Sequence, residues 1–587
     1  MKINRGSGFA FLILVALLLY GSHIFDGYLS DDYLYVSWAS ESVSKLLAKV
    51  TTDSYPRMIR PIPSLPWVIA EGSGTAIILH AISILLHAAN AFLIALIIRK
   101  RTGQERQPYF WASMYLVFPL FAEAVIWLSA SFDLWATVFT LASVYIWQSD
   151  YSVKLRIIFG SFAFAFALLS KESIVLLPLI LLILLPKEKA KTAFFCTALL
   201  VAAYFLTRII IFHSLGGYED STGRTIAASF NLKEFLRAVC VQLPYRILAP
   251  MKRSGALALI FVIFSGTLIL LLAWAGGIRN KFKHIGFALL AFMLALLPAA
   301  PIYHIEADHE GTRLLYFPIA ILVVMLGIAE LRMKKAAISI SMILIIFWAI
   351  ISVVNGRSWS KATTQRDYAL DAMRSSQWRF NPNSTVMVDA YDTFQGAYVF
   401  RNGLKQAAEI TGLRSDIDWK RGTVAQLGAL DASLLGDNIF EIGYSEQGQY
   451  VDWTSCQREA RINDLPVIMN ASFKALAGEQ NPVSSVVSPW VDATKLTKQI
   501  FMSFEIAQCN QAQYEGTVYW RISRQDSFTV TNERKFKIDG AGERRCLVRL
   551  PSMERNANEV QFRLDFNIPI SSNCIDQVLL LKAECEK

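Results

Sequence analysis

Long apolar stretches alternate with short charged loops over the first 354 residues of the chain. A run of about 20 apolar residues can cross a bilayer as a helix, so the pattern predicts a polytopic α-helical membrane protein. The fifth and sixth stretches are short, and a single re-entrant pair is an alternative to two full crossings there. We count about eleven candidate transmembrane helices, at residues 9–25, 76–98, 109–128, 132–148, 156–170, 173–186, 193–212, 256–274, 285–301, 314–330 and 336–354.

The sequence after Val354 has the composition of a soluble domain. The run from Ser384 to Ala390 predicts a buried strand, and the residues up to about Thr411 are compatible with a helix. Later runs alternate between apolar and polar residues, which is typical of strands; they lie at 517–522, 527–531, 546–550, 560–566 and 577–582. We therefore expect a membrane domain at 1–354 and a soluble α/β to β-rich domain at 355–587, ending in a small β-sandwich.

Basic residues gather on one side of the predicted spans. Lys and Arg are enriched in cytoplasmic loops, so this side and the N-terminus are expected in the cytoplasm. Loops 26–75, 214–255 and 302–313 and the soluble domain then lie outside, with interfacial helices in the first two loops. The net charge of +10 is largely this asymmetry, so no nucleic-acid partner is expected. The basic residues are Lys2, Arg5, Arg99, Lys100, Arg101 and Arg106, with further groups at 187–191, 279–283 and 332–335.

The first span and the cysteines agree with this orientation. No small-residue cleavage pattern follows the first span, so we expect it to be retained rather than removed as a signal peptide. An oxidising compartment allows disulfides in the external half, although five cysteines leave at least one unpaired within the chain. No Cys or His spacing predicts a zinc site. The external cysteines are Cys456, Cys509, Cys546, Cys574 and Cys585.

Two adjacent carboxylates, Asp31 and Asp32, follow directly after the first span. Uncompensated acidic groups beside hydrocarbon are costly, so their presence there points to a functional site. The alternative is that one of them only caps a helix that starts near Tyr33. The sequence leaves both interpretations open.

Further polar residues lie at the outer ends of the predicted spans, on the same side as Asp31 and Asp32. Each alone is compatible with a membrane-edge anchor or a local ion pair, but acids and bases that converge on one face indicate a site. They are Arg57, Arg60, Glu123, Asp133, Lys171, Glu172, Arg208, His304, Glu306, Asp308, His309 and Arg313.

His80 and His87 are seven residues apart in the second span and share one face of its helix. Buried polar contacts between helices are the favoured interpretation, and support of the site is the alternative.

Several segments of the membrane part resemble the GT-C superfamily of polyprenyl-phosphate-sugar-dependent glycosyltransferases, in particular its protein O-mannosyltransferase-like group. The resemblance covers roughly residues 9–335 and lies in the order and spacing of the motifs. They are Asp31-Asp32, Arg60-Pro61, Leu79-His-Ala-Ile-Ser-Ile-Leu-Leu-His-Ala-Ala-Asn, Glu123-Ala-Val-Ile-Trp-Leu-Ser with Asp133, Leu169-Ser-Lys-Glu-Ser, and Arg313-Leu-Leu-Tyr-Phe-Pro.

The resemblance implies an inverting transfer of a sugar from a polyprenyl phosphate to a hydroxyl of an envelope glycan such as O-antigen, a lipid or a protein. Asp31 or Asp32 would act as the general base. Arg313, Lys171, Arg208 and Arg60 would stabilise the leaving phosphate, with Arg313 and Lys171 ranked first. Glu123, Asp133, Arg57, Glu172, His80 and His87 would support the acceptor or the site. No cofactor is expected to be required, although paired acids are compatible with a divalent cation.

The expected location is a bacterial inner membrane, with the active site and the soluble domain in the periplasm. A transporter or flippase of a lipid-linked sugar is an alternative, but it would need polar groups across the membrane midplane, where charge is scarce here. A non-catalytic envelope assembly protein is a third alternative. The partners in every case are a lipid-linked sugar and membrane lipids.

Overall fold

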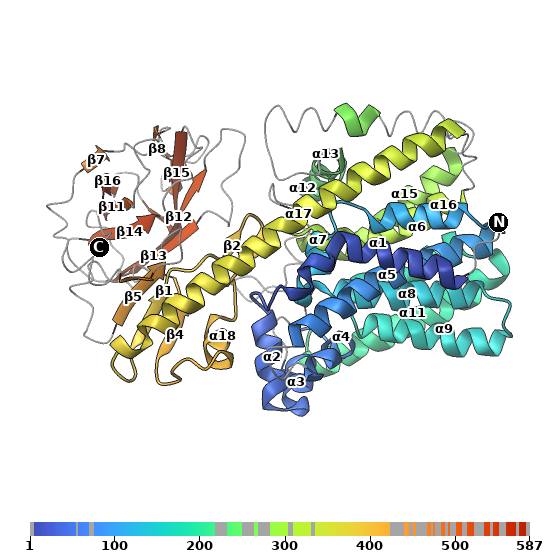
Figure 1. The fold of residues 1–587 in the computed structure, drawn as a ribbon, viewed down its shortest axis with the longest axis horizontal. Coiled ribbons are helices and arrows are strands. Elements are labelled where there is room, and N and C mark those ends of the chain that lie inside the picture. Colours follow the sequence, from blue (N-terminus) through green and yellow to red (C-terminus); the bar gives the residue numbers. More distant parts are fainter. Residues whose placement is uncertain are drawn as a thin grey trace. The chain divides into compact units, whose positions relative to one another are not determined.

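The computed structural model describes residues 5–53, 57–69, 75–215, 217, 232–248, 263–267, 282–302, 309–329, 335–422 and 439–444, and from residue 450 on only the strands. The chain divides into two compact units. The first comprises Met1–Lys361 and Gln395–Ala397, and the second comprises Ala362–Phe394 and Tyr398–Lys587. Figure 1 shows the helices of the first unit and the strands of the second.

Six helical stretches in the described part are long and apolar enough to cross a membrane. Each corresponds to one of the predicted spans, so the expectation of a helical membrane domain is confirmed for these six. They are Gly6–Phe25, Ala76–Thr102, Leu128–Gln148, Lys187–Phe212, Lys283–Ala300 and Ser339–Arg379.

Four other predicted spans form shorter helices, and prolines explain two of the interruptions. The stretch at 109–128 breaks at Pro119 into α6 (Gln107–Leu116) and α7 (Ala122–Ile126), because a proline inside a helix removes a backbone hydrogen bond. Pro178 lies in the first turn of the short helix α10 (Leu177–Leu184). The other helices of these stretches are α9 (Val153–Leu168), η4 (Glu172–Ile174), η9 (Thr312–Leu315) and α16 (Tyr316–Ile328).

Most of the remaining predicted span, 256–274, lies outside the described residues. The total of eleven spans therefore stays a prediction.

Helix α5 (Thr75–Thr102) lies at the centre of the membrane unit, in contact with α1, α6, α8 and α16. Its fully buried positions include Ala88 and Ala91, and small residues of this kind let neighbouring membrane helices approach closely. The other long helices are α1 (Arg5–Tyr20), α8 (Phe132–Gln148), α11 (Lys187–Phe212), α15 (Phe282–Leu296) and α17 (Lys335–Ser376), with the short turns η1 (Gly21–Phe25), η3 (Leu128–Ala130) and η8 (Leu297–Ile302).

The two predicted external loops contain short helices, as expected. The first loop holds α2 (Asp32–Glu41), α3 (Val43–Lys49), α4 (Pro61–Ser64) and η2 (Leu65–Ile69). The second holds α12 (Leu232–Arg237), the π-helical turn η6 (Ala238–Gln242) and α13 (Leu243–Leu248).

The second unit begins within α17 and continues into a mixed sheet. Strand β1 (Thr385–Val388) pairs in parallel with β4 (Asp418–Arg421) and β5 (Ile439–Tyr444), and β6 (Tyr450–Asp452) is antiparallel to β5. Between β1 and β4 lie the hairpin β2 (Thr393–Phe394) and β3 (Ala397–Tyr398) and the helix α18 (Leu404–Ile410). The predicted strand near Ser384 is therefore confirmed. The helix expected up to about Thr411 is confirmed for Leu404–Ile410 only, because the hairpin of β2 and β3 occupies the earlier part of that stretch.

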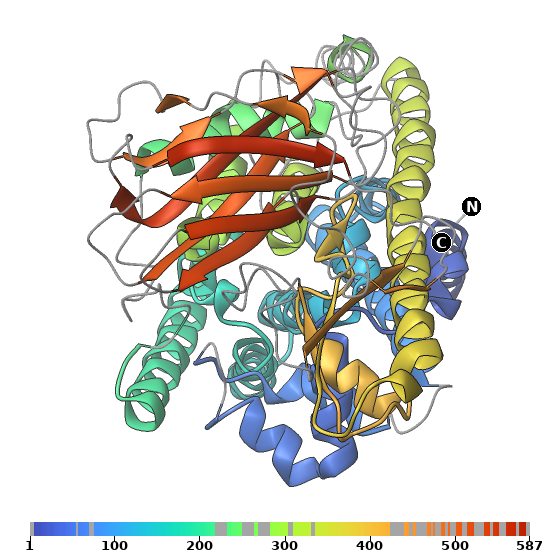
Figure 2. The same ribbon diagram turned by 90° about the vertical axis from the view of Figure 1, so that its left-hand side faces the viewer.

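Two antiparallel sheets form the rest of this unit and appear as the orange and red arrows in Figure 2. One has the order β13-β12-β15-β9-β8, with β10 paired to β15, and the other has the order β14-β11-β16-β7. The predicted strand-containing region is thus present. Its strands are β7 (Val467–Asn470), β8 (Lys474–Ala475), β9 (Val483–Val487), β10 (Val491–Asp492), β11 (Ile500–Ile506), β12 (Gln513–Arg521), β13 (Glu533–Asp539), β14 (Arg544–Leu550), β15 (Glu559–Ile570) and β16 (Ile575–Lys582).

Some expectations for this half fall outside the described residues. The predicted strand at 527–531 is one of them. Cys456, Cys509, Cys574 and Cys585 lie outside as well, so the disulfides expected there stay a prediction. In the membrane half, Cys196 and Cys240 are free thiols.

Candidate functional site

The loop that follows the first span carries Asp31 and Asp32 and lies against the turn between α7 and α8. The Asp32 side chain is buried, with only 1% of its surface exposed. Its Oδ2 accepts a hydrogen bond from the Leu29 N–H at 2.9 Å, and its Oδ1 accepts from the Ser129 N–H at 2.8 Å and the Ser129 hydroxyl at 2.5 Å. Asp32 therefore joins two distant segments and does not act only as a helix cap.

Asp31 differs from its neighbour in burial. It occupies the N-cap position of α2, but its side chain makes no capping hydrogen bond, and the residue is partly exposed. The preceding residue, Ser30, is buried and has a left-handed backbone with φ of 50°. A non-glycine residue in this region is strained and needs support from its surroundings. The Trp127 indole gives such support by donating to the Leu29 carbonyl at 3.3 Å.

Burial raises the pKa of Asp32 from its ordinary 3.8 to about 7. The hydrogen bonds from Ser129 and Leu29 favour the ionised form and act against this shift, whereas the charge of Asp31 adds to it. Asp32 therefore binds a proton close to neutral pH.

The first loop is also held at its start. The Asp26 carboxylate accepts hydrogen bonds from His23 Nδ1 at 2.7 Å and from the Ser360 hydroxyl of α17 at 3.1 Å. At Gly356, one turn earlier in α17, an added Cβ would lie 2.6 Å from His23 Nε2. The absence of a side chain at Gly356 therefore lets α17 approach His23 closely.

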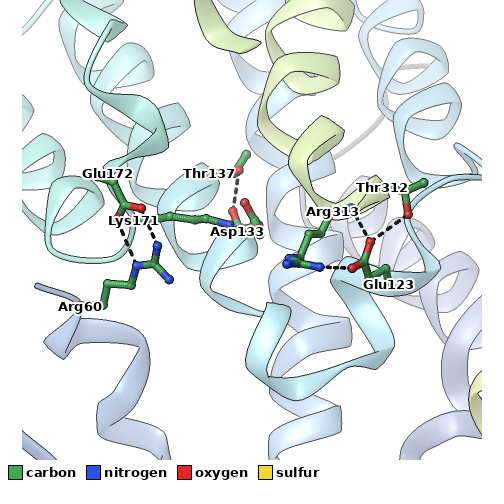
Figure 3. Close-up of polar contacts among 8 residues, drawn as sticks. All are labelled: Arg60, Glu123, Asp133, Thr137, Lys171, Glu172, Thr312 and Arg313. Carbon is green, nitrogen blue, oxygen red and sulfur yellow. Dashed lines mark hydrogen bonds and ion pairs between the residues drawn. The ribbon is translucent and has the colours of Figure 1, made fainter. Parts of the chain in front are cut away.

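Three ion pairs lie at the same end of the membrane unit (Figure 3). Arg60 binds Glu172 through two hydrogen bonds, from Nε at 3.0 Å and from Nη2 at 2.5 Å. The Lys171 ammonium donates to Asp133 Oδ2 at 2.5 Å, with both side chains more than nine-tenths buried.

The third pair joins Arg313 to Glu123 across a sequence separation of 190 residues. The Arg313 guanidinium donates to Glu123 Oε1, and the Arg313 N–H donates to Oε2 at 2.9 Å. The Thr312 hydroxyl donates to the same Oε2 at 3.2 Å. Glu123, 3% exposed, therefore holds η9, the turn directly before α16, against α7.

Arg60 and Arg313 are close enough to Lys171 for their charges to affect its pKa. Burial lowers the pKa of Lys171; the Asp133 carboxylate acts against this shift, and the charges of Arg60 and Arg313 add to it. For Glu172, burial alone would raise the pKa, but the Arg60 charge and hydrogen bonds outweigh it and lower the pKa to about 2. We call these three pairs the ion-pair row.

The Asp32 loop and the ion-pair row share one segment, residues 127–133. Ser129, which donates to Asp32, lies one helical turn before Asp133. Trp127, which donates to Leu29, has the Arg313 guanidinium 5.1 Å from its ring centre, a cation–π contact. The segment therefore brings the acidic loop together with two of the three pairs.

Arg208, near the outer end of α11, has a different environment. It is 3% exposed, its Nη2 donates to the Arg57 carbonyl at 2.9 Å, and its guanidinium lies 5.6 Å from the Tyr204 ring centre. Within the described part of the chain, Arg208 has no carboxylate partner. Arg57 itself donates to the Ser214 hydroxyl at 3.5 Å.

Glu123 also faces a recess of about 230 Å³, a volume that includes solvent at its mouth. His309, which lines it, is buried and has a left-handed backbone with φ of 74°. The recess is further lined by Pro119, Leu120, Ala122, Thr312, Asn355, Trp359 and Gly396.

Of the two histidines of α5, His87 makes the buried contacts between helices that the sequence favoured. It is fully buried and bonds to Tyr316 of α16 and to the Leu116 carbonyl of α6. His80 is also buried, at 3% exposed. Neither makes a hydrogen bond to the ion-pair row within the described residues.

The remaining predicted site residues, His304, Glu306 and Asp308, lie outside the described residues. In the part of the chain that the structure describes, no three His, Cys, Asp or Glu side chains are grouped to hold a metal ion.

Sequence reasoning missed Ser129 and Trp127, the residues that bind the Asp32 loop. Both lie in the motif Glu123-Ala-Val-Ile-Trp-Leu-Ser, which the sequence analysis had already identified, so this motif could have pointed to them. It also missed Asp26 and Tyr316, whose partners lie in distant helices.

The sequence matches no family model and no curated protein. In structure, the chain is similar to the archaeal oligosaccharyltransferase AglB from Archaeoglobus fulgidus, in a complex with an inhibitory peptide and a dolichol-phosphate. The TM-score is 0.41 at 10% identity, over 97% of this chain and 98% of that one. It is also similar to the arabinofuranosyltransferase AftD from Mycobacteria, with a TM-score of 0.44 at 9% identity, over 99% of this chain and 58% of that one.

Proposed function

We propose that this protein is an inverting glycosyltransferase that moves a sugar from a polyprenyl-phosphate-linked donor to a hydroxyl group of an envelope glycan, lipid or protein at the periplasmic face of a bacterial inner membrane. The observation that carries this proposal is the shared segment 127–133. Through it, a pair of carboxylates at the membrane edge lies beside fixed cations, which is the combination that transfer from a phosphate requires.

In this proposal Asp31 is the general base. A base must come within hydrogen-bond reach of the acceptor hydroxyl, and Asp31 is partly exposed whereas Asp32 is enclosed by three donors. Asp32 then acts as a positioning residue that holds the loop against Ser129. The acceptor proton passes to the Asp31 carboxylate as the acceptor oxygen attacks the anomeric carbon.

The bond between the anomeric carbon and the phosphate oxygen breaks in the same step, and its electron pair leaves with the polyprenyl phosphate. The phosphate thereby gains one negative charge, which fixed cations stabilise without reorganisation. Arg60, Lys171 and Arg313 each share their charge with a carboxylate. Arg208 adds positive charge that no described carboxylate balances, so we assign it together with the three row cations to the leaving phosphate.

Transfer can be measured with the purified full-length protein in detergent, a panel of undecaprenyl-phosphate-linked sugars, and extracted envelope glycans, lipids and secreted proteins as acceptors. Mass spectrometry detects the added sugar. We expect Asp31→Asn to lower the rate about 10²- to 10⁴-fold, the usual contribution of a general base. Asp53→Asn is a matched control in the same loop, because that side chain is 60% exposed.

Wild-type rates in Asp31→Asn would remove Asp31 as the base. Full activity in both Asp31→Asn and Asp32→Asn would exclude the carboxylate pair altogether. If envelope glycans, lipids and secreted proteins carry the same sugars in cells with the gene and in cells without it, this result would contradict the proposed function itself.

A further inference from the structure

Helix α5 carries two polar side chains, His87 and Asn90, near the middle of its membrane-crossing stretch. Both are fully buried. A buried polar group in such an environment is costly unless its hydrogen bonds are satisfied, so the partners of these two side chains matter.

The partners of His87 fix its protonation. Its Nε2 lies 3.0 Å from the Leu116 carbonyl, which can only accept, so Nε2 carries the hydrogen. In a neutral imidazole the other nitrogen, Nδ1, is then an acceptor, and it lies 2.7 Å from the Tyr316 hydroxyl. Tyr316 therefore donates its hydroxyl hydrogen to His87.

Asn90 binds the same hydroxyl from the other side. Its Nδ2 donates to the Tyr316 oxygen at 3.3 Å and to the Leu134 carbonyl of α8 at 3.1 Å. The Tyr316 hydroxyl thus donates to His87 and accepts from Asn90, and both of these side chains belong to α5.

These hydrogen bonds join α5 to three helices whose ends lie close in sequence to members of two of the ion pairs. Tyr316 lies one helical turn after Arg313, and Leu134 directly follows Asp133. Leu116 ends α6, seven residues before Glu123, and its carbonyl is one that the helix end leaves without an intrahelical partner. His87 and Asn90 therefore tie α6, α8 and α16 to one helix.

We propose that His87 and Asn90 act through the Tyr316 hydroxyl as positioning residues, which fix the Lys171–Asp133 pair relative to the Arg313–Glu123 pair and so set the spacing of the cations that bind the donor phosphate. This inference rests on the proposed function. It adds three residues that do not touch the substrate but determine how well the cations match a phosphate, since a displacement of about 1 Å can cost about 100-fold in an oriented site.

The test is the affinity of the purified full-length protein for undecaprenyl phosphate, measured by native mass spectrometry. The Kd reports only on folded molecules, so a loss of folded protein does not change it. We expect Tyr316→Phe, which keeps the ring that packs 4.6 Å from Phe121 but removes the hydroxyl, to raise the Kd about tenfold. Asn90→Leu should also raise the Kd, and the loss in the double variant should be smaller than the sum of the two single losses, because the Asn90–Tyr316 hydrogen bond is common to both.

Thr140→Val is the matched control. Thr140 is a fully buried residue of α8 whose hydroxyl makes no hydrogen bond within the described part of the chain. The Kd of the Thr140→Val variant for undecaprenyl phosphate should equal that of the wild type. If Tyr316→Phe does not fold, the Kd of Asn90→Leu alone tests the positioning role.

The outcomes separate this inference from the function on which it rests. A wild-type protein that binds undecaprenyl phosphate, with Tyr316→Phe and Asn90→Leu binding equally well, would overturn the positioning role and leave the proposed function intact. Additive losses in the double variant would also overturn it. A wild-type protein that does not bind undecaprenyl phosphate would overturn both.

Discussion

Asp32 is a buried carboxylate and Glu172 is a partly buried one, yet their environments drive their pKa values in opposite directions. Asp32 accepts only from neutral donors, and burial raises its pKa to about 7. Glu172 faces the Arg60 guanidinium, which outweighs burial and lowers its pKa to about 2. Burial alone therefore does not determine the charge of an acid here; the presence of a cation does.

This difference in pKa suits the two carboxylates to different roles. A carboxylate whose pKa lies near neutral pH can exchange a proton with its surroundings, whereas one held ionised by a guanidinium keeps its charge and fixes geometry. Asp133 and Glu123 resemble Glu172 in having a cationic partner. Asp32 can therefore change its protonation near neutral pH, whereas Glu172 stays ionised and fixes the position of Arg60.

The largest expected effect comes from removing a cation from the row. Lys171→Met would leave Asp133 buried without its partner, in a position like that of Asp32, and breaking a buried pair typically costs about 3–5 kcal/mol. The free energy of unfolding, followed by thermal denaturation in detergent, should fall accordingly. The double variant Lys171→Met with Asp133→Leu removes the stranded charge and should recover much of the loss. A single variant as stable as the wild type would show that the pair contributes nothing.

The second effect concerns Asp32 and has a defined sign. Because the pKa of Asp32 is higher in the folded protein than its ordinary 3.8, the folded state binds the proton more tightly, and stability falls as the pH rises from about 4 to about 7. Asp32→Asn cannot ionise and should lack this loss, which by linkage amounts to at most about 4 kcal/mol. Melting curves at pH 5 and pH 8 measure it. An unchanged pH dependence in Asp32→Asn would contradict the raised pKa.

The third effect is smaller and opposite in sign. Since the pKa of Glu172 is lowered from 4.5 to about 2, its contribution is present above pH 4.5 and is lost as the pH falls toward 2. Its linkage contribution is at most about 3 kcal/mol. Glu172→Gln should therefore be less stable than the wild type at pH 6 but approach it at pH 3. The same difference between variant and wild type at both values would mean that the Arg60 pair does not hold Glu172 ionised.

Much of the membrane unit could be predicted from the sequence, because an apolar run of sufficient length is a local signal. The acidic pair was found in the same way, from its position directly after a span. The breaks near Pro119 and Pro178 were harder to place, since a proline within an apolar run can either kink or end a helix.

The partners within the site could not be predicted from the sequence. Glu123 and Arg313 are 190 residues apart, and Arg60 and Glu172 are 112 residues apart, so their pairing depends on how the helices pack. The sequence ranked Arg313 and Lys171 first as phosphate ligands because they lie in recognisable motifs. The structure adds that both are already bound to carboxylates, whereas Arg208, which lies in no motif, has no such partner among the described residues.

Helix α17 continues for 42 residues without a break, from the membrane span into the second unit. Gly356 lies against His23 and Ser360 donates to Asp26, and further along the same helix Ala369 and Met373 are fully buried. Each residue advances an α-helix by about 100°, so inserting one amino acid between Ser360 and Ala369 would rotate the two contact faces out of phase by that angle. Only an insertion near a whole number of turns would keep the two contact faces in the same angular relation around the helix axis.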